Sequence, residues 1–163
     1  MKGITQTGLG EPRKVPRHHP AQAMTLAEYV RHQNGVPLGA SGALRNMLSR
    51  SLGAGSFTEF WRHWNPIWGY SLGRFVSAPL RRVLPPAPAV ITTFAVSGAL
   101  HDLAATLIRR SATFVITPWF LLLGVGVVFG RFSAMDLSQR PGWVRVTANL
   151  AYLGACLVPV LLI

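Results

Sequence analysis

The sequence predicts an all-α membrane protein with about three transmembrane helices preceded by amphipathic interfacial helices. Half of the 163 residues are apolar and only 13% are charged, whereas a soluble domain carries about 25% charged residues. Three long apolar segments follow one another in the second half of the chain. They cover about 86–108, 112–130 and 146–163, and each has roughly the 17–25 residues that a membrane span needs.

The N-terminal half is basic. Residues 1–23 mix Gly, Pro and basic residues with a histidine pair, and this composition predicts a disordered arm. Residues 24–163 then form a single membrane domain, with the interfacial helices in 24–82. The formal net charge of +11 lies mostly before the apolar segments, which favours contact with anionic lipid or an anionic substrate. Nucleic acid is the rival partner. We exclude it because the basic residues are scattered among aromatic residues and glycines.

Charge also predicts the orientation in the membrane. Placing residues 1–85 and 131–145 in the cytoplasm puts 14 of the 16 Lys and Arg residues inside. Only Arg109 and Arg110, between the first two spans, then lie outside. The abundance of Arg, Ala, Gly and Pro is typical of a GC-rich bacterial gene, so we expect a bacterial cytoplasmic membrane with the N-terminal region inside. The single cysteine, Cys156, lies in an apolar run and is expected to be a small buried hydrophobe.

Two short helices are predicted within residues 24–53. Thr25 and Glu28 have the spacing of a capping box, and the helix that they start should end near Asn34-Gly35. A second helix is expected over 41–52, closing at Gly53. Its leucines and methionine share one face, which is typical of a helix that lies in the membrane interface.

The segment SFTEFWRHWNP, residues 56–66, predicts a third helix. Ser56 and Glu59 have the spacing of a second capping box, and the aromatic residues of the segment recur at the helical period. Pro66 disfavours helical geometry at Asn65, so Asn65 should lie at the helix end. One interpretation is an interfacial anchor in which Asn65 is only a C-cap. A substrate site is the other.

His101 favours the second interpretation. Thr93, Ser97 and His101 are spaced by four and form a polar stripe within an apolar span, and ionisable groups inside a membrane are costly and usually functional. The alternatives for His101 are a hydrogen-bonded packing histidine and a haem ligand, although no span contains a second histidine. Asp102 points about 100° away from His101 and is expected to pair with an arginine of another segment.

The two stretches SFTEFWRHWN and FAVSGALHDLA together resemble the membrane-bound O-acyltransferase family, in particular its wax synthase and sterol or diacylglycerol acyltransferase branches. In that family a motif of the kind FYxDWWN precedes a transmembrane histidine, often in a stretch like SGLxHE. Here the resemblance covers roughly residues 55–108, with 36 positions between Asn65 and His101. His63 stands where one branch has aspartate, and Asp102 where glutamate is common. Family members usually have eight or more spans.

The resemblance implies transfer of a fatty acyl group from acyl-CoA to a hydroxyl acceptor, in the wax ester or lipid synthesis class. His101 would be the general base, and Asn65 would hold the thioester carbonyl or orient a reactant. The expected substrate-binding residues are Trp61, Arg62, Trp64, Arg74 and Ser97. Of these, Arg62 and Arg74, together with Arg81 and Arg82, would meet the phosphates. Neither a metal nor a cofactor is expected beyond acyl-CoA as co-substrate.

Two further hypotheses remain open. The chain could be a non-catalytic, truncated homologue or a small membrane subunit that keeps the motifs by descent. It could instead be a membrane-surface adaptor that binds anionic lipid through its arginines. Because three spans are few for an acyltransferase of this kind, the enzyme hypothesis also allows a homo-oligomer or a partner chain that completes the site.

Overall fold

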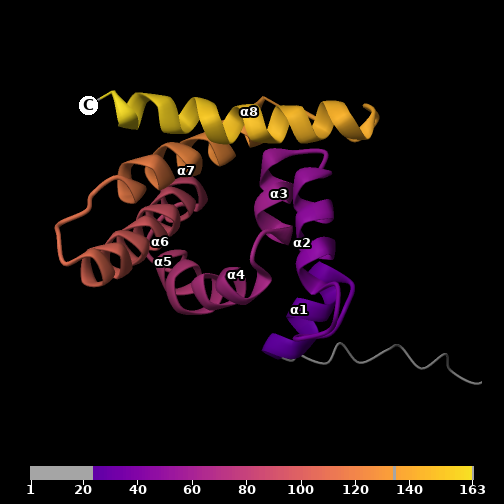
Figure 1. Cartoon of the computed structure of the whole chain (residues 1–163), viewed down its shortest axis with the longest axis horizontal. Helices are drawn as coiled ribbons and strands as arrows, with labels where there is room; N and C mark the ends of the chain where they lie inside the picture. The colour runs from indigo at the N-terminus through magenta and orange to yellow at the C-terminus, as the bar shows by residue number, and fades with distance from the viewer. Residues whose placement is uncertain (1–23, 134, 163) are drawn as a thin grey trace, which may run out of the picture.

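The computed structural model describes residues 24–133 and 135–162, so the arm predicted for residues 1–23 lies outside the described part (Figure 1). Every regular element in these two ranges is helical, which confirms the all-α class. Short helices come first and long apolar helices follow, as the sequence predicts. The elements are α1 (Leu26–Asn34), α2 (Ala43–Leu52), α3 (Phe57–His63), α4 (Pro66–Leu72), the π-helix η1 (Gly73–Ser77), α5 (Ala78–Leu80), α6 (Pro86–Arg109), α7 (Ile116–Phe132) and α8 (Gly142–Leu161).

Local capping fixes the ends of the first two helices. The Thr25 hydroxyl accepts from the Glu28 amide and the Glu28 carboxylate accepts from the Thr25 amide, so the predicted capping box is confirmed. α1 ends at Gly35 with φ +78°, a conformation that glycine adopts without steric cost. The prediction that the second helix closes at Gly53 is also confirmed.

The capping box predicted for the third helix is only half formed. The Ser56 hydroxyl accepts from the Glu59 amide as expected, but the Glu59 carboxylate accepts from the Gly55 amide at 3.1 Å instead of from the Ser56 amide. The helix also ends earlier than predicted, because Trp64 already has extended backbone geometry.

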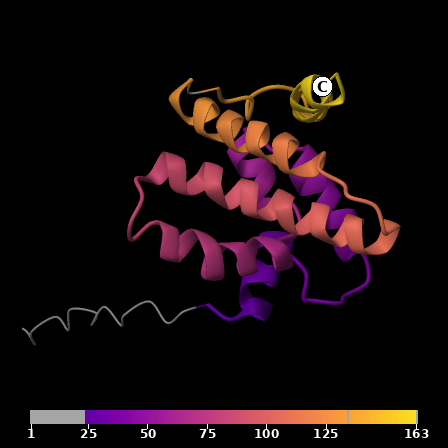
Figure 2. The same ribbon diagram turned by 90° about the vertical axis from the view of Figure 1, so that its left-hand side faces the viewer.

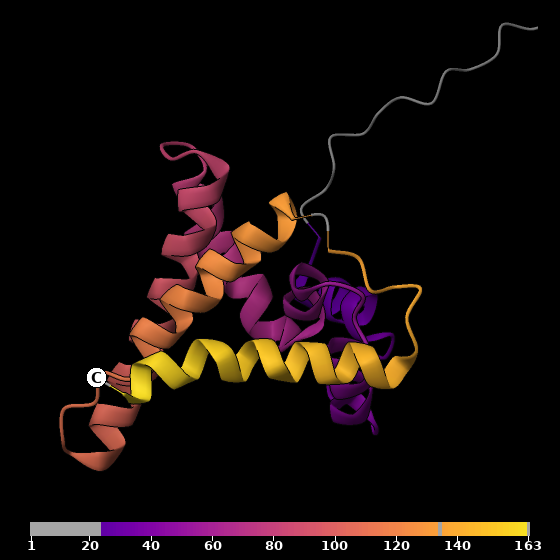
Figure 3. The same cartoon turned by 90° about the horizontal axis from the view of Figure 1, so that it is seen from above.

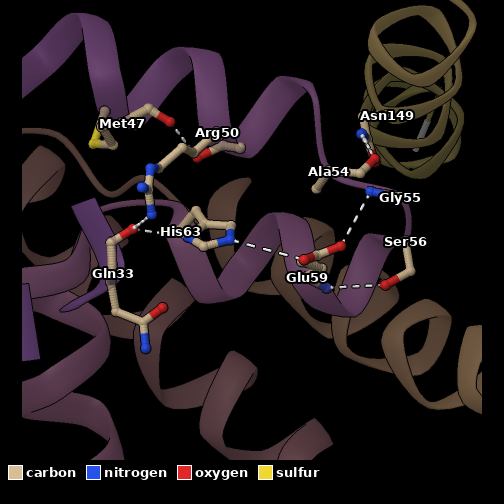
Figure 4. Close-up of polar contacts among 10 residues, drawn as sticks. Gln33, Met47, Arg50, Ala54, Gly55, Ser56, Glu59, His63 and Asn149 are labelled. Carbon is tan, nitrogen blue, oxygen red and sulfur yellow. Dashed lines mark hydrogen bonds and ion pairs between the residues drawn. The ribbon is translucent and has the colours of Figure 1, made fainter. Parts of the chain in front are cut away.

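A polar cluster joins these three helices (Figure 4). The backbone carbonyl of Gln33 in α1 accepts from His63 Nδ1 of α3 at 2.9 Å and from Arg50 Nη1 of α2 at 3.1 Å. His63 Nε2 lies 4.0 Å from Glu59 Oε1. Gln33 is buried, and its carbonyl is one of several contacts that join the unit of α1, α2 and α3, since Asn34 and Asn46 also link α1 to α2.

The long helices α6 and α7 pack as a close antiparallel pair. A Cβ atom at Gly98 would lie 2.7 Å from Thr117 Cα, and one at Gly124 would lie 2.9 Å from Phe94 Cβ. Glycines therefore let the two helices approach closely, as small residues do between membrane helices. The loop between them is longer than predicted: α7 begins at Ile116, not near residue 112.

Asp102 ties this pair together, and the expected pairing with an arginine is wrong. Its buried carboxylate accepts from the backbone amides of Val115, Ile116 and Thr117 and from the Thr117 hydroxyl, at 2.6–3.2 Å. These amides lie at the start of α7, where a helix has unsatisfied donors and the positive end of its dipole. The N-terminus of α7 thus supplies the hydrogen-bond donors and the positive potential that we expected from an arginine.

The last helix, α8, crosses the α6–α7 pair rather than running beside it (Figures 1 and 2). Seen from above, it also extends over the short helices (Figure 3). The buried Asn149 amide of α8 donates to the Leu52 and Ala54 carbonyls at the end of α2, and Trp119 Nε1 of α7 donates to the Leu153 carbonyl. α8 is therefore anchored to both halves of the molecule.

Two helices, α6 and α8, are long and apolar enough to cross a membrane. Only 17% and 6% of their most apolar windows are buried within the chain, which is unlike the core helix of a soluble protein. α7 has 17 residues, at the lower limit for a span. The predicted count of about three spans therefore corresponds to two helices of sufficient length and a shorter apolar one.

Candidate functional site

The two motifs predicted to form a site line one cavity. Its volume is about 340 Å³, and its walls come from α3, α4, α6 and α7, with contributions from α1 and η1. Six of the seven predicted site residues line it: Trp61, Arg62, Trp64, Asn65, Ser97 and His101. The fold thus brings the aromatic segment and His101 of α6 together, although Asn65 and His101 lie 36 positions apart.

The hydrogen bond of His101 fixes its tautomer. His101 Nδ1 lies 2.7 Å from the Ser97 carbonyl oxygen, one turn earlier in α6. A backbone carbonyl can only accept, so Nδ1 must carry the hydrogen. In the neutral ring the lone pair is then on Nε2. His101 is exposed and lines the cavity, and its Nε2 has no hydrogen-bond partner among the described residues.

Two aromatic rings hold the imidazole in place. The Trp68 ring meets it edge to face, with centroids 5.4 Å apart, and the Phe120 ring lies 5.3 Å away. Trp68 Nε1 donates to the Ser97 hydroxyl at 2.9 Å. Ser97, expected to touch the substrate, is buried, and its carbonyl and hydroxyl orient His101 and Trp68.

Asn65 has an unusual backbone conformation. Its φ of +40° and ψ of +71° are left-handed, a region that asparagine tolerates better than most residues. It caps the start of α4, not the end of α3, because its Oδ1 accepts from the Trp68 amide at 3.3 Å. Within the described part of the chain its Nδ2 has no hydrogen-bond partner. One end of the amide is thus held by Trp68 and the other is free at the cavity.

The predicted aromatic face of α3 builds the remaining wall. Trp64 stacks on the buried Phe60 with centroids 5.5 Å apart, and Trp61 meets Phe94 of α6 edge to face at 5.0 Å. Trp61 Nε1 is buried, with no acceptor among the residues described. Buried donors normally find a partner, so this N–H is an unmet donor beside the cavity.

Some of the arginines line the cavity and others do not. Arg62 lines the cavity and is exposed, as is Arg131 from the end of α7. Tyr29 of α1 also lines the cavity, and burial raises the pKa of its phenol although the positive charge of Arg62 opposes that shift. Arg74 is not brought to the cavity, because it is exposed and donates to the Tyr70 hydroxyl at 3.2 Å.

The lining residues that were not among the predicted site residues include Tyr29, Phe120 and Arg131. A cationic residue that ends an apolar helix is a visible signal for Arg131, but its place at the cavity depends on how α7 folds back on α6. Nothing local distinguishes Phe120 from the other aromatic residues of the apolar segments.

Comparisons of the chain with protein-family models, with curated proteins and with solved structures find no match.

Proposed function

We propose that this protein is a membrane acyltransferase that moves a fatty acyl group from acyl-CoA to a hydroxyl acceptor, in the wax ester or lipid class. The observation that carries the proposal is the hydrogen bond from His101 Nδ1 to the Ser97 carbonyl. It leaves the lone pair of the neutral ring on Nε2, and His101 lines the same cavity as Asn65.

The reaction needs one proton acceptor and no covalent enzyme intermediate. His101 Nε2 takes the proton from the acceptor hydroxyl as its oxygen attacks the thioester carbonyl carbon. The new carbon–oxygen bond forms, and the carbon–sulfur bond then breaks. The leaving thiolate of CoA recovers the proton from the imidazolium, so the neutral histidine is regenerated.

The other lining residues have matching roles. The free Nδ2 of Asn65 can donate to the thioester oxygen as negative charge develops on it, an interaction that is strongest in a site shielded from water. Arg62 and Arg131 at the same cavity suit the phosphate groups of the donor, because guanidinium groups bind phosphate in a bidentate manner. Trp61, Trp64 and Phe120 supply apolar surface for the first part of the acyl chain.

The charge distribution supports an orientation for this chemistry. With the residues before α6 in the cytoplasm, most of the Lys and Arg residues lie on the side where anionic lipid and acyl-CoA occur. We propose that Arg62 and Arg131 lie on the cytoplasmic side of the membrane, which the composition of the chain suggests is a bacterial one.

The test is an acyl transfer assay on membranes that carry the full chain alone. Labelled long-chain acyl-CoA and a panel of long-chain alcohols, diacylglycerol and sterol are supplied, and esters are separated and counted. We expect turnover above empty membranes, and a loss of at least about 100-fold in His101→Ala, since general bases contribute about that much. His32→Ala is the matched control, because His32 is an exposed histidine on α1 outside the cavity.

The controls separate the enzyme from the alternatives. Expression levels are matched by immunoblot, and melting temperatures in detergent show whether each variant folds. No turnover by the folded wild-type chain would reject a self-sufficient enzyme and favour a subunit that acts only with a partner. Equal turnover in wild type and His101→Ala would reject His101 as the base.

A further inference from the structure

A second cavity lies between α2 and the start of α8, and it shares no residue with the cavity of His101. Its volume is about 670 Å³. Leu44, Leu48 and Leu52 of α2 and Val146 of α8 give it an apolar floor, and Arg45 and Arg145 bring one positive charge from each helix. A cavity with an apolar floor and two cations suits an amphiphilic anion.

The two arginines have no counter-charge in the part of the chain that the structure describes. No carboxylate lines the cavity, and the only ion-pair contact among the described residues joins His63 and Glu59. Arg145 Nε is buried without a hydrogen-bond partner there. A buried donor that lacks a partner is costly, and more so when it is charged. Arg145 is therefore poised to bind an acceptor from outside the chain, and the exposed Arg45 lines the same cavity.

The start of α8 adds to the positive potential. A Cβ atom at Gly142, the first residue of α8, would lie 3.9 Å from Arg145 Nη2. The guanidinium thus lies beside the positive end of the helix dipole, where a cation is unfavourable and an anion is stabilised. An anion held between Arg45 and Arg145 would relieve this repulsion.

The apolar surroundings indicate which anion. Leu44 is 66% exposed and Trp143, on the first turn of α8, is 72% exposed. Apolar side chains of α8 continue away from the cavity, with little of the helix buried within the chain. A free inorganic anion gains nothing from such a surface, whereas lipid acyl chains do. Exposed tryptophan is typical of the level of lipid headgroups.

We propose that this cavity is a binding site for an anionic phospholipid. Its phosphate lies between Arg45 and Arg145, and its acyl chains lie against the leucines of α2 and the apolar side of α8. This site does not depend on the acyl transfer proposed above. Its role would be to fix α2 and α8, which Asn149 already joins, at the surface of the membrane.

The test uses the full chain purified in an uncharged detergent. Native mass spectrometry follows binding of phosphatidylglycerol and of phosphatidylcholine with the same acyl chains. We expect phosphatidylglycerol to bind more tightly, and Arg145→Gln and Arg45→Gln each to weaken it about fivefold or more, since charge-assisted hydrogen bonds to phosphate are lost. Arg31→Gln on α1 removes the same charge outside the cavity and should leave the affinity unchanged.

Three results would overturn the proposal. Equal weakening by Arg31→Gln would mean diffuse attraction to a basic surface. Displacement of the lipid by excess inorganic phosphate would mean a site for a soluble anion. Equal binding of the two lipids would remove the arginines from recognition. Arg45 is exposed, so Arg45→Gln keeps the test decisive even if Arg145→Gln fails to fold.

Discussion

The α6–α7 pair and the α1–α3 unit each contain a histidine that donates from Nδ1 to a backbone carbonyl. His101 donates to Ser97 at 2.7 Å and His63 donates to Gln33 at 2.9 Å. The second nitrogen distinguishes the two residues. His63 Nε2 lies 4.0 Å from the Glu59 carboxylate, while His101 Nε2 belongs to an exposed ring at the cavity. The same tautomer thus serves as a structural link in one region, and in the other it leaves Nε2 without a hydrogen-bond partner among the described residues.

The two regions also differ in the burial and the hydrogen bonds of their carboxylates. Asp102 is buried and accepts four hydrogen bonds that join α6 to the start of α7. Glu59 is 45% exposed and accepts one hydrogen bond, from Gly55, in a cluster where several residues share the contacts (Figure 4). An apolar helix pair depends on single polar residues, whereas a polar unit distributes its contacts. This contrast predicts where substitutions are costly.

The largest effect on stability should come from Asp102→Ala. It removes the acceptor for the first amides of α7 and leaves them in apolar surroundings, so we expect the free energy of unfolding to fall by about 3 kcal/mol. Thermal unfolding in mixed micelles, followed by circular dichroism, measures the loss.

Asp102→Asn is the matched variant for that measurement. It keeps one oxygen as the acceptor for two of the four donors, but its NH2 group faces the other two and the charge that faces the dipole of α7 is lost, so it should cost about 2 kcal/mol. If Asp102→Ala unfolds at the wild-type temperature, the carboxylate does not hold the α6–α7 pair together.

Asn65 should give the next largest effect, on turnover rather than on stability. Asn65→Asp keeps the oxygen that caps α4 but lacks the free amide donor, and Asn65→Gly fits the positive φ without a side chain. If the amide stabilises the thioester oxygen, both variants should lose roughly 100-fold in the rate of acyl transfer. Their melting temperatures should stay close to that of the wild type. Full activity in either folded variant would leave Asn65 as a helix cap alone.

The sequence predicted the helices well because their ends depend on nearby residues. Thr25, Gly35, Gly53 and Ser56 act within one turn of their own positions, so their spacing alone is informative. The partner of Asp102 was missed because it is a helix N-terminus exposed by a longer loop than expected. Likewise, the contact of Asn149 with Leu52 spans 97 positions, and no local pattern carries such information.

The candidate site was predictable only in part. Asn65 and His101 stand out as polar residues beside aromatic or apolar runs, and both reach the cavity. Asn65 caps α4 because Pro66 starts a new helix at once. A proline at this position is equally compatible with the end of a helix, so the sequence did not show which helix Asn65 caps. Arg74 looked equivalent to Arg62 from charge alone, but the turn of η1 directs it to Tyr70.

Close packing of α6 on α7 should give an intermediate effect on stability. Gly98→Ala places a Cβ atom 2.7 Å from Thr117 Cα, so the helices must separate, and we expect a loss of about 2 kcal/mol. Gly130→Ala is the matched control because nothing lies within 4 Å of a Cβ atom there. It should stabilise the same pair by up to about 1 kcal/mol through helix propensity. Destabilisation by both variants to the same extent would contradict the close approach at Gly98.

The smallest single effects are expected at the Gln33 carbonyl in the α1–α3 unit. His63→Ala or Arg50→Ala removes one of its two donors and leaves the other, so each should cost less than about 1 kcal/mol. The double variant leaves a buried carbonyl without these donors, and it should cost about 1 kcal/mol more than the sum of the single losses. Thermal unfolding of the four proteins measures this excess, with the exposed pair His32→Ala and Arg31→Ala as the additive control. If the losses in unfolding free energy at Gln33 are simply additive, neither donor compensates for the loss of the other. The contrast with Asp102, whose single carboxylate accepts from all the donors at the start of α7, would then fail.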